Sequence, residues 1–189
     1  EQKLFFDWKT VDVSKVQPCP TDEDGEDGED GEDGEDREPP DGDSMCELVD
    51  QLEVADEHGR DGYDRDLFGG YDRDALLAES LAEWGDYYSF WDNQHYDDPS
   101  EVDVDHTVAL AEAWDSGAHA WSEEQRDKFA ADPANLTLLT DNLNASKGDR
   151  DIAEWLPPYE PHVDEYVLAY VGVKAAYNLT VDPAEQAVL

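Results

Sequence analysis

The spacing of hydrophobic residues predicts a chain that alternates short strands with short helices. Val102 and Val104 alternate with acidic residues, which is typical of a strand with one buried face. In the stretch DALLAESLAEW, residues 74–84, hydrophobic residues recur three and four positions apart, which predicts an amphipathic helix that Gly85 ends. The other predicted strands cover 3–16, 87–96 and 136–140, and the other predicted helices cover 44–50, 107–116, 122–131, 142–150, 163–177 and the segment after Asp182.

These elements together predict an α+β fold, in which short strands are embedded in a small, mainly helical single domain. We expect three regions: an N-terminal strand segment over 1–20, an acidic loop without fixed structure over 21–43, and the folded domain over 44–189. A chain of 189 residues is long enough to bury one hydrophobic core. It contains no run of 18 apolar residues, so we expect no membrane span.

Acidic residues dominate the composition and change the expected partners. The chain has 51 Asp and Glu against 12 Lys and Arg, a net charge of −39. The segment TDEDGEDGEDGEDGEDREPPDGD, residues 21–43, holds 14 of the acids and has no hydrophobic residue. The rest of the chain still carries 37 acids and 11 bases, so the folded part is acidic in its own right. We interpret this composition as an adaptation to high salt; the alternative is a surface that mimics DNA with its carboxylates.

Two cysteines, Cys19 and Cys46, flank the acidic segment. In an oxidising compartment we expect them to form a disulfide, and closing a loop of this length stabilises a fold by about 3.5 kcal/mol in the chain-entropy model. The alternative is a pair of free thiols. The opening residues EQKLFFDW lack the basic and apolar regions of a signal peptide, so a signal has either been removed or never existed.

The strand at 102–106 ends in polar residues that suit phosphodiester chemistry. Asp105 and His106 close this strand, and Asn144 follows the next predicted strand. A neutral imidazole can accept a proton from water near pH 7. A carboxylate and an amide oxygen can hold a hard divalent cation and leave positions open for phosphate and water. The order strand, excursion, strand, helix is that of a ββα-metal finger.

Three basic residues are candidates for contacts with substrate phosphate. Lys147 and Gly148 follow Asn144, where an ammonium and a close backbone approach could hold a non-bridging oxygen. Arg150 lies just beyond, and Arg65 lies upstream in the stretch YDRDLF, where contact with DNA and pairing with a neighbouring aspartate are both open. We expect the few cations to gather near the site and the acids to lie elsewhere.

The stretch from VDVDHTVALAEAW through LNASKGD to IAEWLPP, residues 102–158, resembles the secreted HNH endonuclease family and its D-H-[IV]-V-P-L-A-E-A-W signature. RDGYDRDLFG at 60–69 is similar to an upstream segment of that family, and KAAYNLTVDPAEQAVL to its C-terminal helix pair. The likeness covers about 130 of 189 residues. It implies that 44–189 is an HNH nuclease domain that hydrolyses DNA without sequence preference.

The resemblance also implies residue roles. His106 matches the family's general base, and Asp105 and Asn144 match its metal ligands. Asn135 matches the middle asparagine of the catalytic set, which orients the finger loop. Thr107 and Ala109 replace the usual Ile or Val and Pro, which we interpret as packing changes.

Two further residues stay open at this stage. The family's C-D-T-R segment corresponds to YDRD at 71–74, which puts any role of Arg73 in doubt. Glu112 lies on the helix after His106, where an indirect role behind the site and a solvated helix face are both open.

Our prediction from sequence is a secreted, extracellular, salt-adapted, metal-dependent endonuclease. We expect Mg²⁺ as the divalent metal, with Mn²⁺, Ca²⁺ or Zn²⁺ as alternatives. We expect DNA as the substrate, with RNA as the alternative, and a monomer that does not bind membranes. The alternative function is a non-catalytic acidic DNA mimic or cation-binding interaction protein on an HNH scaffold.

Overall fold

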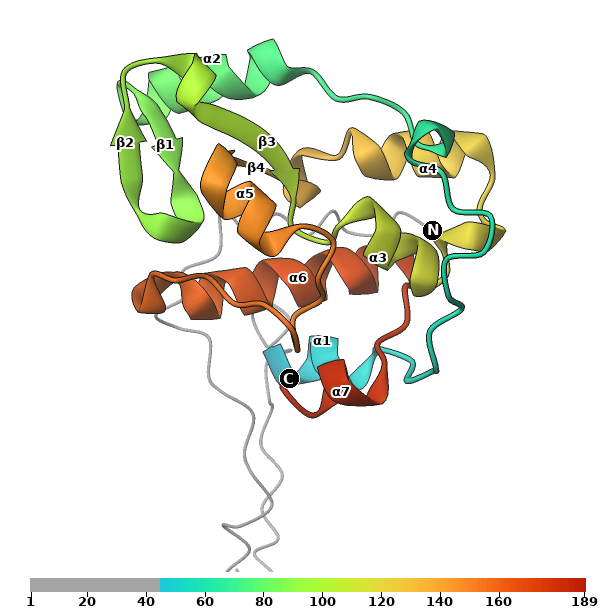
Figure 1. The fold of residues 1–189 in the computed structure, drawn as a ribbon. Helices are drawn as coiled ribbons and strands as arrows, with labels where there is room; N and C mark the ends of the chain where they lie inside the picture. The colour runs from blue at the N-terminus through green and yellow to red at the C-terminus, as the bar shows by residue number, and fades with distance from the viewer. Residues whose placement is uncertain (1–44) are drawn as a thin grey trace, which may run out of the picture.

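A computed structural model describes residues 45–189 of this chain, with side chains from Leu48 onward. The predicted N-terminal strands, the acidic loop and the Cys19–Cys46 disulfide lie outside the described residues. The described part is a small α+β domain, about half helical, with two short two-stranded sheets, as the sequence predicts (Figure 1). No helix in the described part of the chain is both long and apolar enough to cross a membrane.

Two antiparallel sheets form the strand part of the domain. In the first, β1 (Tyr87–Ser89) pairs with β2 (Gln94–Tyr96) as a hairpin. In the second, β3 (Val102–His106) pairs with β4 (Leu136–Thr140), so that Val102 faces Thr140 and His106 faces Leu136. Val102, Val104, Leu136 and Leu138 are buried beneath α2 in a small hydrophobic cluster. This burial explains why the alternating pattern of 102–106 folds as a strand.

Several of the described helices begin at a residue whose side chain caps the backbone. Their bounds are α1 (Met45–Asp50), α2 (Arg73–Glu83), α3 (Leu110–Asp115), α4 (Glu123–Ala130), α5 (Asp141–Lys147), α6 (Val163–Tyr177) and α7 (Pro183–Gln186). A capping box of Ser122 and Gln125 begins α4. Asp182 begins α7 in the same way with Glu185. Such caps satisfy backbone N–H groups that a helix end leaves without partners.

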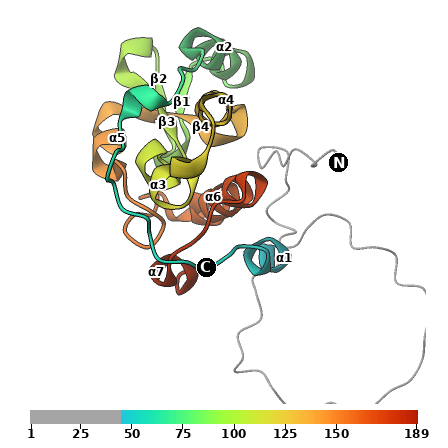
Figure 2. The same cartoon turned by 90° about the vertical axis from the view of Figure 1, so that its right-hand side faces the viewer.

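Helix α6 runs through the main core. Tyr166, Leu168, Tyr170 and Val171 on this helix are buried and pack with residues of α1, α3 and the segment after α5. Figure 2 shows α3 lying beside α6, with α1 and α7 at the same end of the molecule. Outside the two sheets, the described residues Val54 and Val181 form an isolated parallel β-bridge. In the view of Figure 1, helix α6 lies below the β3–β4 sheet, so the core built around this helix supports the sheet from one side.

Two helices depart from the sequence prediction by three residues at one end. Helix α3 begins at Leu110 rather than at residue 107, because Asn135 Oδ1 accepts a hydrogen bond from Val108 N and holds that segment extended. Helix α5 ends at Lys147 rather than at residue 150. Its cap residue Gly148 has φ of 58°, a left-handed conformation that ends the helix and favours glycine.

The segment before α2 packs closely against α4. Arg126 Nε donates to the carbonyl of Leu67 over 3.0 Å. At Gly69, an added Cβ would lie 2.8 Å from Asp127 Oδ1 and 3.1 Å from Asp127 Cα. Because the second contact is with backbone, a side chain at position 69 would push the segment and α4 apart.

Candidate active site

The end of β3 and one face of α5 bring the predicted site residues together. Asp105 and His106 are the last two residues of β3, and α5 follows β4 directly, so that Asn144 returns to β3. Asn144 and Lys147 are three residues apart and therefore share one face of α5. This arrangement is strand, strand and helix in the order that the sequence predicts for a ββα finger.

An open cleft of about 500 Å³ lies at this point. Its lining includes Asp105 from β3, Asn144 from α5, Gly148, and Arg65 and Tyr71 from the upstream segment. Asp105, which carries a carboxylate, and Asn144, which carries an amide, thus line the same space. Oxygen ligands of this kind suit Mg²⁺, Mn²⁺ or Ca²⁺ better than a softer metal.

His106 lies directly behind the wall of this cleft. Its side chain is buried, and Tyr71, which lines the cleft, contacts the imidazole ring at a centroid distance of 5.5 Å. Its Nε2 lies 2.9 Å from the carbonyl oxygen of Ala130 at the end of α4. A carbonyl only accepts, so Nε2 carries the proton and Nδ1 is left with a lone pair. Burial lowers the pKa of His106 to about 4, which keeps the ring neutral near pH 7.

Lys147 forms a buried ion pair with Asp105. Its side chain is fully buried, and Nζ lies 3.0 Å from Asp105 Oδ2 and donates to the carbonyl of His106 over 2.8 Å. Burial raises the pKa of Asp105, and the ammonium opposes that shift. No hydrogen bond of good geometry reaches Asp105 Oδ2 despite the short distance. The structure thus turns Lys147 toward Asp105 and away from the solvent-exposed position that a phosphate contact requires.

Asn135 holds the chain that follows His106. Its Oδ1 accepts from Val108 N over 2.8 Å and its Nδ2 donates to Val108 O over 3.2 Å. Thr107 N also donates to the carbonyl of Asn135. Asn135 is fully buried and does not line the cleft. These contacts hold the backbone of residues 107–108, directly after His106.

The three arginines considered from sequence lie in different surroundings. Arg65 is exposed and lines the cleft, where it can reach a substrate. Arg150 is exposed, and its guanidinium donates to the carbonyl of Ser146 at the end of α5. Arg73 donates to the carbonyls of Pro99 and Val102 and so holds the start of β3. Of the three, only Arg65 belongs to the cleft lining.

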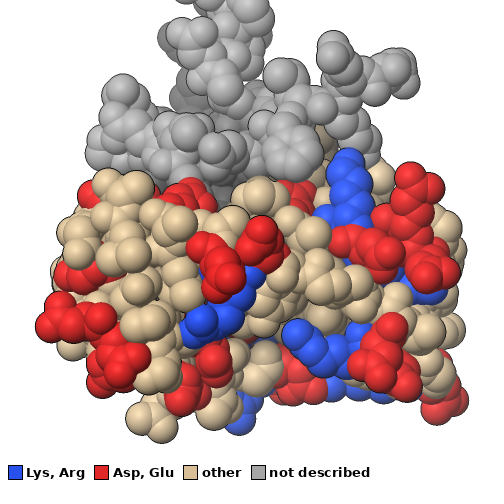
Figure 3. All heavy atoms as spheres, turned by 90° about the horizontal axis from the view of Figure 1, so that it is seen from above, with Lys and Arg blue, Asp and Glu red and all other residues tan. Residues whose placement is uncertain are grey.

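The expectation that acids lie away from the site is wrong. Asp103 and Asp149 line the cleft beside Asp105. Asp103 lies at the cleft because it is the exposed residue of β3. Asp149 lies there because it directly follows Gly148, the residue that ends α5. On the face drawn in Figure 3, Asp and Glu side chains likewise lie next to the Lys and Arg side chains. The basic residues on that face therefore have negative charge beside them.

A second group of charged residues, which we did not predict, lies on the other side of α3. Glu112 is buried and its Oε1 lies 2.7 Å from Lys174 Nζ on α6, so a solvated helix face is excluded for it. Lys174 also lies 2.5 Å from Glu185 on α7. The sequence signal was weak: a lone lysine inside the apolar run VLAYVGVKAAY, which indicates a buried charge with a partner.

Comparison with known proteins places the chain in a family. Residues 64–189 match the family of GmrSD restriction endonucleases, C-terminal domain. The chain belongs to this family. The match covers the cleft-lining residues from Arg65 to Asp149, and Tyr63 lies just before it. The family of GmrSD C-terminal domains is HNH-like and consists of endonuclease domains, so membership suggests phosphodiester hydrolysis with a nucleic acid substrate.

The chain is also similar to an "Uncharacterized secreted protein" of the fungus Arthroderma benhamiae. The two are 32% identical over 170 residues, which cover 79% of this chain and 83% of that protein. No solved structure matches the chain. Nucleases of the HNH-like type are typically metal-dependent, which agrees with the oxygen ligands in the cleft.

Proposed function

We propose that this protein is a secreted, metal-dependent endonuclease that hydrolyses DNA phosphodiester bonds. The observation that carries the proposal is the meeting of Asp105 and Asn144 in one cleft, with His106 directly behind it. Family membership supports nuclease activity, and the relative named as secreted supports an extracellular location. We take Mg²⁺ as the working metal and DNA as the working substrate.

The residues present fit a hard divalent cation at the cleft. Asp105 would contribute a carboxylate oxygen while Lys147 Nζ stays beside the same carboxylate. Asn144 would contribute its amide oxygen from the facing helix. When bound, such a cation supplies charge stabilisation to the phosphate and to the leaving oxygen.

His106 is the proposed general base. The carbonyl of Ala130 holds Nε2–H, so the tautomer and the ring orientation are fixed and Nδ1 is the atom that accepts a proton from the attacking water. Asn135 holds the next residues of the chain and thereby the position of the imidazole. Tyr71 lines the cleft and contacts the imidazole ring, so its side chain borders the path that water would take from the cleft to His106.

The roles of the cations differ in this proposal. Lys147 neutralises part of the buried charge of Asp105 and fixes its carboxylate, and so acts as a positioning residue. Arg65 is the cation that contacts substrate phosphate from the cleft wall. Arg150, which lies just beyond the cleft, gives a second and more distant contact.

Nicking of supercoiled plasmid DNA by the purified full-length chain tests the proposal. We expect nicked and then linear DNA with Mg²⁺, no cleavage after chelation, and recovery when Mg²⁺ is restored. A single-stranded RNA of matched length, assayed in parallel, identifies the substrate class. An intact plasmid under all metal conditions, together with DNA-independent binding of nuclease or DNA-binding proteins, would support an acidic mimic instead.

A further inference from the structure

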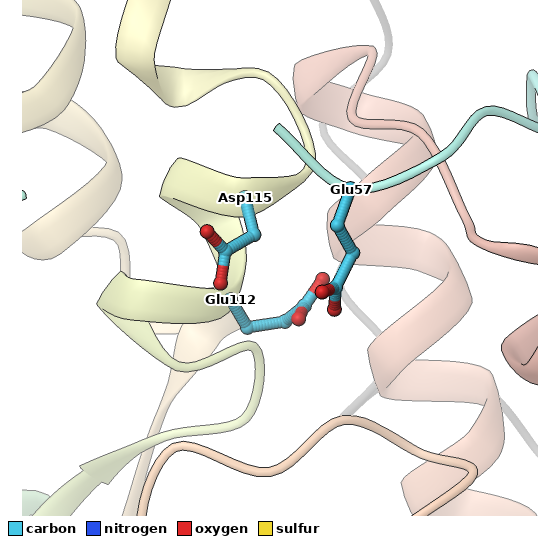
Figure 4. A group of neighbouring side chains, drawn as sticks. All are labelled: Glu57, Glu112 and Asp115. Atoms are coloured by element: carbon cyan, nitrogen blue, oxygen red, sulfur yellow. The ribbon is translucent and has the colours of Figure 1, made fainter. Parts of the chain in front are cut away.

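A group of carboxylates gathers on the side of α3 that faces away from the cleft. Glu112 and Asp115 lie three residues apart on one face of α3, and Glu57 approaches them from the extended segment before the upstream motif (Figure 4). One carboxylate oxygen from each residue lies within 4.8 Å of the other two. Glu57 also reaches Asp151 and Asp182 within the same limit.

The backbone holds Glu57 in place although its side chain is exposed. Ala55 N donates to the carbonyl of Val181 over 2.9 Å, and His58 N donates to the carbonyl of Asp115 over 2.8 Å. These bonds join the segment to the end of α3 and to the segment before α7. Glu57 is therefore presented to Glu112 and Asp115 by fixed backbone.

One carboxylate oxygen in the group lacks a partner inside the protein. The Asp115 side chain is only 2% exposed. Its Oδ2 accepts from Arg60 Nε over 2.7 Å, whereas Oδ1 is buried and has no hydrogen bond. A buried carboxylate oxygen without a donor is costly, and a ligand that binds it removes that cost.

The nearby cations are too few to balance the group. Lys174 is shared by Glu112 and Glu185, and Arg60 is shared by Asp115 and Asp149. No Lys, Arg or His nitrogen within the described residues forms an ion pair with Glu57. Buried carboxylates that outnumber their partners destabilise a fold unless a cation joins them.

We propose that Glu57, Glu112 and Asp115 form a second metal site that binds a hard divalent cation, with Ca²⁺ preferred. The available donors are oxygens only, which favours Ca²⁺ or Mg²⁺ over metals that take nitrogen or sulfur. Two oxygens on opposite sides of one Ca²⁺ lie up to about 5 Å apart, since Ca–O distances are about 2.3–2.6 Å. Oxygen separations of no more than 4.8 Å fit that limit, and Ca²⁺ tolerates the irregular geometry that Mg²⁺ resists.

The site would connect residues 57–65 to helix α3, which directly follows the strand that carries two of the active-site residues. Helix α3 follows the strand that carries Asp105 and His106, and Arg60 reaches Asp149 at the rim of the cleft. A cation held by Glu57 and α3 would therefore fix the path of residues 57–65, which ends at Arg65 in the cleft. Its role is structural, and the site takes no part in the cleavage step.

Calcium-dependent thermal unfolding of the full-length protein tests this site. The protein is stripped of metal with a chelator and dialysed, and its melting temperature is followed by circular dichroism as CaCl₂ is added at constant ionic strength. We compare wild type with Glu57→Gln, which keeps the shape of an exposed side chain, and with Glu83→Gln, an exposed acid on α2 outside the group. Loose binding of calcium to the acidic segment is the same in all three proteins.

We expect calcium to raise the melting temperature of wild type and Glu83→Gln with the same saturating midpoint. Glu57→Gln should need about tenfold more calcium or should show no saturation, because one charged ligand is lost. Asp105→Asn, which disables the cleft, should keep the wild-type midpoint. Equal midpoints for wild type and Glu57→Gln, no calcium effect on wild type, or loss of the effect in Asp105→Asn alone would each overturn the proposal.

Discussion

Lys147 and Asp105 form an ion pair between α5 and β3 that is closed to solvent, with Nζ and Oδ2 3.0 Å apart. Each charge depends on the other, because a single unpaired charge in that position costs several kcal/mol. We expect Lys147→Met to lower the free energy of unfolding by about 3–5 kcal/mol. Urea denaturation measures this loss.

Lys128→Met is the matched control, since Lys128 is an exposed lysine on α4 that lies 6.0 Å from the Tyr177 ring centroid. We expect that change to cost less than about 1 kcal/mol. If Lys147→Met is as stable as wild type but cleaves DNA more slowly, Lys147 contacts phosphate directly and its positioning role is wrong.

His106 should be needed for cleavage and dispensable for metal binding. We expect His106→Ala to reduce the rate constant for plasmid nicking by about 10²–10⁴-fold, which is typical for loss of a general base. His95→Ala provides the control, because His95 is an exposed histidine that pairs with Asp86. A rate within threefold of wild type for His106→Ala would remove this residue from the mechanism.

Asn144 should hold the catalytic metal, whereas Asn142, two residues earlier on α5, should not. Asn144 lines the cleft and Asn142 is exposed outside it. We expect Asn144→Ala to raise the Mg²⁺ concentration for half-maximal nicking by about tenfold or more. Asp105→Asn should act in the same direction. Calorimetric titration that gives the same Mg²⁺ affinity for Asn144→Ala and Asn142→Ala would argue against the ligand assignment.

Salt should increase activity before it reduces it. A chain of net charge −39 repels DNA over a Debye length of about 10 Å at 0.1 M salt, which falls to about 3 Å at 1 M. Because the chain has few cations, counterion release contributes little to its affinity for DNA. Little affinity is therefore lost through this effect as the salt concentration rises. We expect the initial rate to rise above ~0.1 M and to stay high at ~1 M.

The rate is to be measured on duplex DNA at saturating Mg²⁺, and circular dichroism at each salt concentration separates folding from binding. Asp103 and Asp149 line the cleft, so salt should screen the repulsion of DNA at the cleft as well as over the whole surface. A rate that is highest at the lowest salt and then falls would favour an interaction surface over salt adaptation.

The local pattern predicts the elements better than it predicts their orientation. Val102, Val104 and the run LTLLT mark β3 and β4 because one face of each strand is buried against α2. The start of α3 could not be predicted, because it is set by Asn135, a residue 27 positions from Val108 along the chain. Local sequence carries no information about such a distant partner.

The same limit applies to the candidate site. Asp105 and Asn144 were predicted to meet, because the order of two strands and a helix brings their ends together. The direction of Lys147 depends on how α5 is rotated against β3, which tertiary packing decides. The carboxylate group of Glu57, Glu112 and Asp115 was missed because its members come from segments more than 50 residues apart.

The contact between Gly69 and α4 links a turn to the chemistry of the cleft. Helix α4 ends at Ala130, whose carbonyl holds the His106 ring, and Gly69 packs against Asp127 one turn earlier. A library of random variants screened for cleavage would therefore report Gly69 as intolerant of substitution. An engineer who altered only the residues that line the cleft would overlook it, although it packs against the helix whose last carbonyl holds the imidazole.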